Sequence, residues 1–137
     1  MTEQMMTFEV SAKLQDSSGS VVHSKQAELQ IDTSMAGRLD ALNPVELLLA
    51  SLSACIIKGI ERVAGTLGID YETVDVSLVA HRPVAEARIE DISYKVMLGT
   101  SADQAKLDLL HKNLMKFGTI YNTIKSGTTL TGEIFAK

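Results

Sequence analysis

Residues 43–68, NPVELLLASLSACIIKGIERVAGTLG, decide the fold of this chain. Pro44 suits the first turn of a helix, where its missing N–H is not needed, and Asn43 can cap the free N–H groups that follow. Gly65 and Gly68 stand at the far end, where glycine commonly stops a helix. The stretch therefore predicts one helix of roughly 20 residues, about 30 Å long.

Almost every face of this helix is apolar or small from residue 47 to residue 57. A helix of this kind must be buried. Its apolar run is only about 11 residues long, whereas a bilayer needs roughly 18 to 20, so we exclude a membrane span. The helix has more apolar surface than one small sheet can cover, which predicts a second subunit on its other face. We therefore expect a homodimer.

The length and composition indicate an ordinary globular protein. The 137 residues favour a single domain over residues 1–137, large enough to bury a core without disulfides. The net charge is −4 and no Lys/Arg run is present, which argues against nucleic-acid binding. One cysteine cannot form an internal disulfide, and the first residues lack the basic and apolar segments of a secretory signal. We therefore expect a cytoplasmic protein.

Alternating apolar residues precede the central helix. Alternation over residues 7–14 and 27–31, with a return of the chain from residue 21, predicts three antiparallel strands. Residues 33–42 have no clear period and contain Gly37, so they are read as a loop that leads to the helix. Arg38 in this loop is a candidate site residue.

The second half of the chain predicts two more strands and a second helix. Residues 73–80 and 89–98 alternate and are expected to pair. A wide apolar face over residues 105–116 predicts a helix capped by Thr100 or Ser101, and a short helix over residues 119–124 follows. The β-forming residues of the last ten positions predict a strand that closes the sheet. This order predicts an α+β fold with a mostly antiparallel sheet.

Cys55, near the middle of the central helix, is the candidate reactive residue. A free cysteine in an aliphatic helix is often only a small core residue, which is the simpler interpretation. At about 100° per residue, Lys58 and Arg62 share the face of Cys55, and nearby cations stabilise a thiolate. Glu46 lies on the opposite side of the helix, where its charge suits the first turn. The pattern alone therefore leaves both a core and a reactive role open for Cys55.

Neither the histidines nor the glycines predict a cofactor site. His23, His81 and His111 have no spacing that places two of them on one face as metal ligands, so we expect no metal and no other cofactor. An alternative function is a dimeric protein that holds a small apolar ligand without chemistry. The expected pocket is lined by Leu48, Leu52, Ile56 and Met115.

Residues 31–55, IDTSMAGRLDALNPVELLLASLSAC, resemble the OsmC and organic hydroperoxide resistance (Ohr) family. The most specific part is Asn43-Pro44-x-Glu46-Leu47 followed by Ala54-Cys55, and the predicted element order agrees along nearly the whole length. The resemblance implies an intertwined homodimer in which two central helices lie between wrapped sheets. It also implies thiol sites at the subunit interface and reduction of organic hydroperoxides by paired cysteines. Cys55 matches the peroxidatic cysteine of the family.

The chain departs from the family pattern at three places. Gly118 opens the segment GTIYNT where the family has its resolving cysteine, and Val45 stands where the peroxidase members have a glutamate. That glutamate pairs with an arginine from an N-terminal loop, but the loop QDSSGS here has none. Arg38 and Glu46 are candidates for a substitute pair, with Lys58 as further support. The resemblance thus implies a one-cysteine hydroperoxide reductase in oxidative-stress defence that depends on an external thiol.

Overall fold

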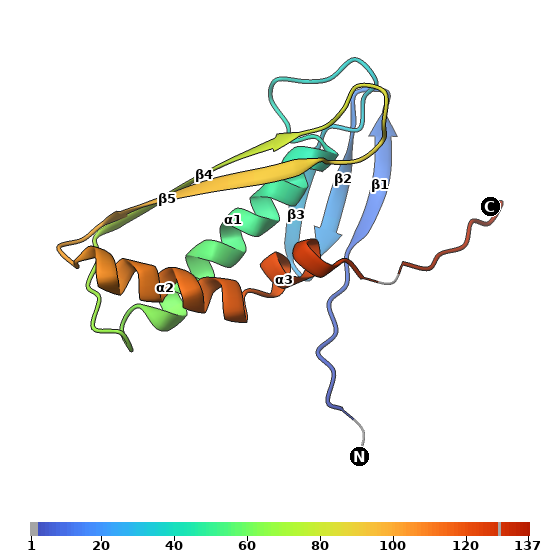
Figure 1. The fold of residues 1–137 in the computed structure, drawn as a ribbon. Coiled ribbons are helices and arrows are strands. Elements are labelled where there is room, and N and C mark those ends of the chain that lie inside the picture. The colour runs from blue at the N-terminus through green and yellow to red at the C-terminus, as the bar shows by residue number, and fades with distance from the viewer. Residues whose placement is uncertain (1–2, 129) are drawn as a thin grey trace. The chain divides into compact units, whose positions relative to one another are not determined.

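The computed structural model describes residues 3–128 and 130–137. The elements in chain order are β1 (Ser11–Asp16), β2 (Gly19–Ser24), β3 (Ala27–Ile31), α1 (Pro44–Val63), β4 (Thr73–His81), β5 (Asp91–Gly99), α2 (Gln104–Phe117) and α3 (Thr119–Ser126), as Figure 1 shows. The chain forms two compact units, residues 1–48 and 49–137, and α1 begins in the first and continues in the second. The expectation of a single domain stays a prediction.

The N-terminal unit contains an antiparallel sheet in the order β1-β2-β3. All six residues of β1 are exposed, and the buried residues of this unit gather at the start of β2 and the end of β3. The first strand was expected from residue 7, but it begins at Ser11. The reason is that Ser11 pairs with His23, and the chain turns at Lys25 into β3, so earlier residues have no strand opposite them.

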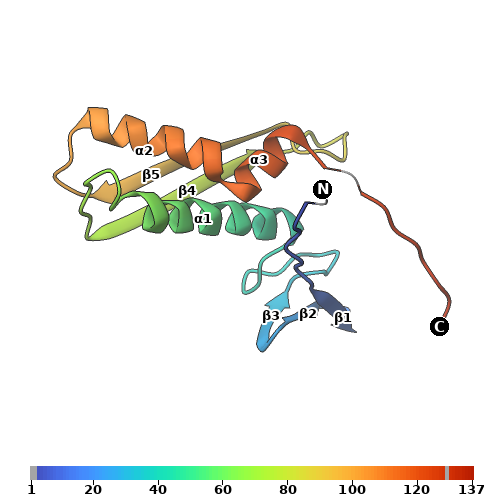
Figure 2. The same cartoon turned by 90° about the horizontal axis from the view of Figure 1, so that it is seen from below.

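The C-terminal unit is built on the antiparallel hairpin of β4 and β5. Val76 pairs with Val96 and the register is regular from end to end, which confirms the predicted strand pair. In both strands every second residue is half-buried and the residues between are exposed. Helices α1 and α2 lie on the same side of the hairpin, as Figure 2 shows from below. One face of the hairpin is therefore core and the other faces outward.

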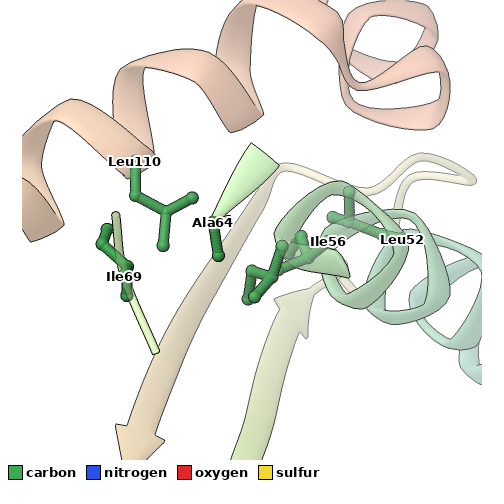
Figure 3. Close-up of a cluster of buried hydrophobic side chains, with 6 residues drawn as sticks. Leu52, Ile56, Ala64, Ile69 and Leu110 are labelled. Atoms are coloured by element: carbon green, nitrogen blue, oxygen red, sulfur yellow. The ribbon is translucent and has the colours of Figure 1, made fainter. Parts of the chain in front are cut away.

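The core of this unit is aliphatic. Its buried residues come from α1, the segment after it, and α2; they are Leu52, Ile56, Ile60, Ala64, Ile69 and Leu110 (Figure 3). Ile60 is fully buried. The inward residues of β4 and β5 and the apolar residues of α3 pack against this cluster. The prediction that the central helix is buried among aliphatic side chains is therefore confirmed on this face.

Two details of the second half differ from expectation. Asp103 caps α2, since its carboxylate accepts a hydrogen bond from the Lys106 N–H (3.0 Å), whereas Thr100 Oγ1 instead accepts from the Ala102 N–H (3.1 Å). The C-terminal strand is not formed by residues 130–137, and Thr129 lies outside the described residues. Neither sheet of the single chain pairs with this segment, so its β-forming residues have no ladder to join.

These elements confirm the α+β class, with two antiparallel sheets and three helices in the part of the chain described. A search of residues 3–128 and 130–137 found no helix both long enough and apolar enough to span a bilayer. The second half of α1 carries the charged residues Lys58, Glu61 and Arg62, which interrupt its run of apolar residues.

Candidate active site

The helix that carries Cys55 is started by a reciprocal pair of hydrogen bonds. The Asn43 side-chain oxygen accepts from the Glu46 N–H, and the Glu46 carboxylate accepts from the Asn43 N–H, each at 2.9 Å. This capping box satisfies two backbone donors that a helix start would leave free. It confirms Asn43 as the cap. The Glu46 carboxylate is therefore engaged at the start of the helix, whereas the sequence had suggested a supporting role for it at the thiol.

Cys55 is half-buried and lies beside Gly118, the residue between α2 and α3. A Cβ atom built on Gly118 would stand 3.4 Å from the Cys55 sulfur. The same Cβ would stand 2.8 Å from the Leu114 carbonyl oxygen and 3.2 Å from the Tyr121 Cβ, so the backbone passes close to its neighbours here because residue 118 is a glycine. The structure therefore brings Cys55 together with the residue that the sequence comparison placed at the missing resolving cysteine.

A second glycine sets the distance between α1 and α2. A Cβ on Gly59 would come within 2.6 Å of the Leu114 side chain, so only glycine lets Leu114 pack against α1 at this point. Gly59 lies one turn after Cys55 on the same helix. The glycine therefore lets α2 approach α1 one turn away from the thiol.

The predicted cationic support is less direct. The Lys58 and Arg62 side chains are exposed. Within residues 3–128 and 130–137, neither side chain has a hydrogen bond or an ion pair with Cys55. The shared helix face that the spacing predicted therefore brings these cations to the surface of α1. Their supporting role stays a prediction.

Arg38, in the N-terminal unit, is bound to acidic neighbours. Its guanidinium makes two hydrogen bonds of 2.9 Å to the Asp40 carboxylate, and its Nη1 donates to the Ser18 carbonyl oxygen at 3.4 Å. Ser18 lies in the turn between β1 and β2, so an arginine does reach this turn, although from a different loop. Arg38 and Glu46 thus have separate partners, and the substitute pair suggested by the sequence is not formed in the described residues.

Asp32 organises the loop that holds Arg38. Its carboxylate accepts hydrogen bonds from the Ser34 hydroxyl (2.5 Å), the Ser34 N–H (2.9 Å) and the Arg38 N–H (2.8 Å). These hydrogen bonds, with that of the Ser34 hydroxyl the strongest, hold the pKa of Asp32 below its ordinary value. The loop expected to lack regular structure is therefore fixed by one carboxylate.

The predicted apolar pocket is only partly assembled. Leu52 lines a small pocket of about 110 Å³ together with Ile92, Tyr94, Tyr121, Ile124 and Lys125. Ile56 is packed in the core, Met115 is half-buried, and Leu48 is exposed and belongs to the N-terminal unit. The four-residue pocket therefore stays a prediction, and the side chains that do surround Leu52 include aromatic residues that the pattern had not singled out.

Three aromatic side chains form a connected group near this pocket. The Tyr94 hydroxyl and the His111 Nε2 are hydrogen-bonded at 2.6 Å, and the rings of Tyr94 and Tyr121 meet edge to face at 6.4 Å. Burial, with a smaller contribution from Tyr121, raises the pKa of Tyr94, so its hydroxyl stays protonated at neutral pH. The alternation of β5 indicated that Tyr94 points inward. No signal in the sequence indicated that its hydroxyl meets His111.

Within residues 3–128 and 130–137, no group of three His, Cys, Asp or Glu side chains is arranged to hold a metal ion. The sequence model of the OsmC-like protein family matches residues 37–133, which include Cys55 and Gly118. The chain belongs to the OsmC-like protein family.

Solved structures agree with this assignment at the level of the fold. An OsmC-like protein from Mycoplasma pneumoniae is 15% identical, with a TM-score of 0.83 over 90% of this chain and 91% of that chain. An organic hydroperoxide resistance protein OsmC from Legionella pneumophila is 19% identical, with a TM-score of 0.65 over 90% and 93%. The organic hydroperoxide resistance protein OhrB of Bacillus subtilis is 19% identical, with a TM-score of 0.62 over 89% and 93%. Among curated proteins no match was found.

Proposed function

We propose that this OsmC-like protein is a one-cysteine organic hydroperoxide reductase in oxidative-stress defence, with Cys55 as the reacting residue. The observation that carries the proposal is that Cys55 is only half-buried and lies beside Gly118, where a Cβ atom would stand 3.4 Å from the sulfur. A half-buried thiol can be reached by a peroxide while the protein stays folded.

The reaction follows from the chemistry of a single thiol. The Cys55 thiolate attacks one peroxide oxygen, the O–O bond breaks, and the alkoxide leaves and takes up a proton to become an alcohol. Cys55 becomes a sulfenic acid. An external thiol then displaces its hydroxyl as water to give a mixed disulfide. A second external thiol attacks this disulfide, restores the Cys55 thiol and leaves as the oxidised external disulfide.

The supporting residues have a defined place in this proposal. Arg38 and Glu46 are candidates to orient the peroxide, and each would have to exchange its present partner, Asp40 or the Asn43 N–H, to do so. Lys58 is the candidate cation on α1 itself. The protein then needs no cofactor beyond the external thiol, and its expected location is the cytoplasm.

The test is to trap the sulfenic acid. Equimolar cumene hydroperoxide followed by dimedone should add one dimedone to the peptide that contains Cys55, detected by mass spectrometry within seconds to minutes. Cys55→Ser is the matched control and should add none. If the native thiol is not labelled until the protein is unfolded in urea, Cys55 is a core residue and the reductase proposal fails.

A homodimer is part of the same proposal. Apolar side chains are exposed on α1, α2 and the last segment, where Ile57 is 39%, Phe117 52% and Phe135 81% exposed. A second copy of the chain could cover these exposed apolar side chains, as expected for the homodimer. Sedimentation should therefore give a mass near twice 14.8 kDa. A stable monomer at micromolar concentration would contradict the dimer.

The second candidate is a dimeric protein that binds a small apolar ligand without chemistry. It is favoured by the aliphatic and aromatic residues that line the small pocket at Leu52. The dimedone experiment separates the two candidates, because only the reductase forms a sulfenic acid in the folded state.

A further inference from the structure

The C-terminal unit contains a second, larger pocket that the proposed reaction does not use. It has a volume of about 290 Å³ and lies between β5 and α2, with α1 at its base. Its lining is mostly branched aliphatic, and the residues are Ile60, Tyr94, Val96, Leu98, Gln104, Leu107, Asp108, Leu110, His111 and Leu114. Neither Cys55 nor Gly118 is one of these residues.

The size of the pocket limits its occupant. A volume of about 290 Å³ corresponds to about ten water molecules at roughly 30 Å³ each. An occupant therefore has about ten non-hydrogen atoms. The aliphatic walls, with Ile60 and Leu110 buried beneath them, require that most of these atoms be apolar.

The polar groups of the pocket define one recognition point. When the Tyr94 hydroxyl donates to His111 Nε2, the lone pairs of the hydroxyl oxygen remain to accept from a ligand. An acceptor of this kind matches a ligand hydroxyl, which can donate to it. The T-shaped contact of the two rings, at 5.7 Å, holds this pair in place.

The charge of the pocket excludes one class of head group. Asp108 lines it one turn before His111 on α2, and its carboxylate accepts a hydrogen bond from Gln104 at 2.9 Å. A carboxylate or phosphate ligand would be repelled by this charge, and no Lys or Arg lines the pocket to offset it. A neutral hydroxyl that donates to the Tyr94 oxygen meets no such repulsion.

We propose that the pocket between β5 and α2 binds a small neutral alcohol, with its hydroxyl at the Tyr94–His111 pair and its aliphatic body against the leucine walls. This binding is independent of the chemistry at Cys55. The pocket shares Tyr94 with the small pocket at Leu52, but the four residues of the predicted pocket, Leu48, Leu52, Ile56 and Met115, do not line it.

The test uses n-octanol as the probe and methyl NMR of the full chain as the measurement. Saturable shifts are expected at the methyl groups of Ile60, Leu107 and Leu114. Octanoate at neutral pH, which has the same aliphatic tail and an anionic head, should bind at least tenfold more weakly. Equal binding of octanol and octanoate, or the absence of saturable shifts at these methyl groups, would overturn the proposal.

Two variants locate the site. Leu107→Phe fills the pocket and should abolish the octanol shifts, whereas Leu109→Phe, the same change at a side chain 46% exposed on α2, should keep them. Tyr94→Phe retains the ring and loses one hydrogen bond, so it should weaken octanol binding roughly two- to tenfold. If Leu107→Phe and Leu109→Phe bind octanol equally well, or if Tyr94→Phe binds it as the native protein does, the proposed location of the site is wrong.

Cys55→Ser should bind octanol as the native protein does. A loss of octanol binding in Cys55→Ser would also contradict the proposed location.

Discussion

The β4–β5 hairpin and the β1–β3 sheet share an alternating sequence pattern, but their burial differs. In the hairpin every second residue is half-buried, because α1 and α2 cover one face. In β1 all six residues are exposed, and Leu14 is 70% exposed although it stands at an apolar position of the alternation. An alternating pattern therefore specifies a strand with one apolar face, but the element that covers this face must come from elsewhere.

The largest expected effect tests this difference directly. Leu52→Asp places an unpaired charge in the core of the C-terminal unit, where Leu52 is 3% exposed, and should cost about 3 to 5 kcal/mol or more. Folding and association should be lost together, as seen by circular dichroism and sedimentation. Leu14→Asp is the matched change in β1 and should alter the free energy of unfolding by only about 0.5 kcal/mol. A loss at Leu14 similar to that at Leu52 would mean that a partner covers β1 in solution.

The second prediction concerns the contact between α1 and the junction of α2 and α3. Gly118→Cys should form a disulfide with Cys55 on mild oxidation, because the position for the new Cβ lies 3.4 Å from the sulfur. The bridge should stabilise the oxidised protein by at most about 4 kcal/mol. The gain will be smaller because the new Cβ would also stand 2.8 Å from the Leu114 carbonyl oxygen, so the end of α2 must shift.

Thiol counting and non-reducing mass spectrometry measure this outcome. Thr119→Cys is the control, since the Thr119 side chain is exposed, and both of its thiols should remain free. If Gly118→Cys also keeps two free thiols, the close approach of Gly118 to Cys55 is wrong.

The third prediction tests whether the two units unfold together. Asn43→Ala removes the cap of α1, which begins in the N-terminal unit and carries the core residues of the other, and should cost about 1 kcal/mol. Asn43→Asp keeps the accepting oxygen and should cost little. Urea unfolding followed separately at β1–β3 and β4–β5 by amide exchange should show one shared loss. A loss confined to the N-terminal sheet would show that α1 does not couple the units.

Local patterns were sufficient to predict most of this fold. Pro44, the glycines and the apolar run of residues 43–68 predicted α1, and the structure ends it at Val63, just before Gly65. The alternation of β4 and β5 predicted their pairing. These features depend on neighbours in the sequence, where period and capping act directly.

Features that depend on distant partners could not be predicted in the same way. The last residues have strand composition but no strand, because a strand also needs a second chain segment for its hydrogen bonds. Cys55 was identified as the candidate thiol, but its contact with Gly118 joins positions far apart in the chain. The Tyr94–His111 pair likewise depends on how α2 packs on β5, which no local period encodes.

The smallest predicted effect is a difference in pH dependence between the two units. A hydrogen bond from the His81 ring to Asp91, across the end of the hairpin, raises the pKa of His81 above its ordinary value of 6.5. The contribution of this pair to stability is complete below pH 6.5 and is lost as the pH rises through the raised pKa.

In the N-terminal unit the pKa of Asp32 is lowered from 3.8, chiefly by the Ser34 hydroxyl. The contribution of Asp32 to stability is therefore present above pH 3.8 and is lost as the pH falls through the lowered pKa. The protection of amides from exchange, relative to the intrinsic rate at each pH, should therefore fall at the loop end of the hairpin on the alkaline side of 6.5, and in the loop after β3 only in acid. His81→Gln should remove the first change and Asp32→Asn the second, each without moving the other. A His81→Gln protein that keeps the alkaline change would show that another group causes it.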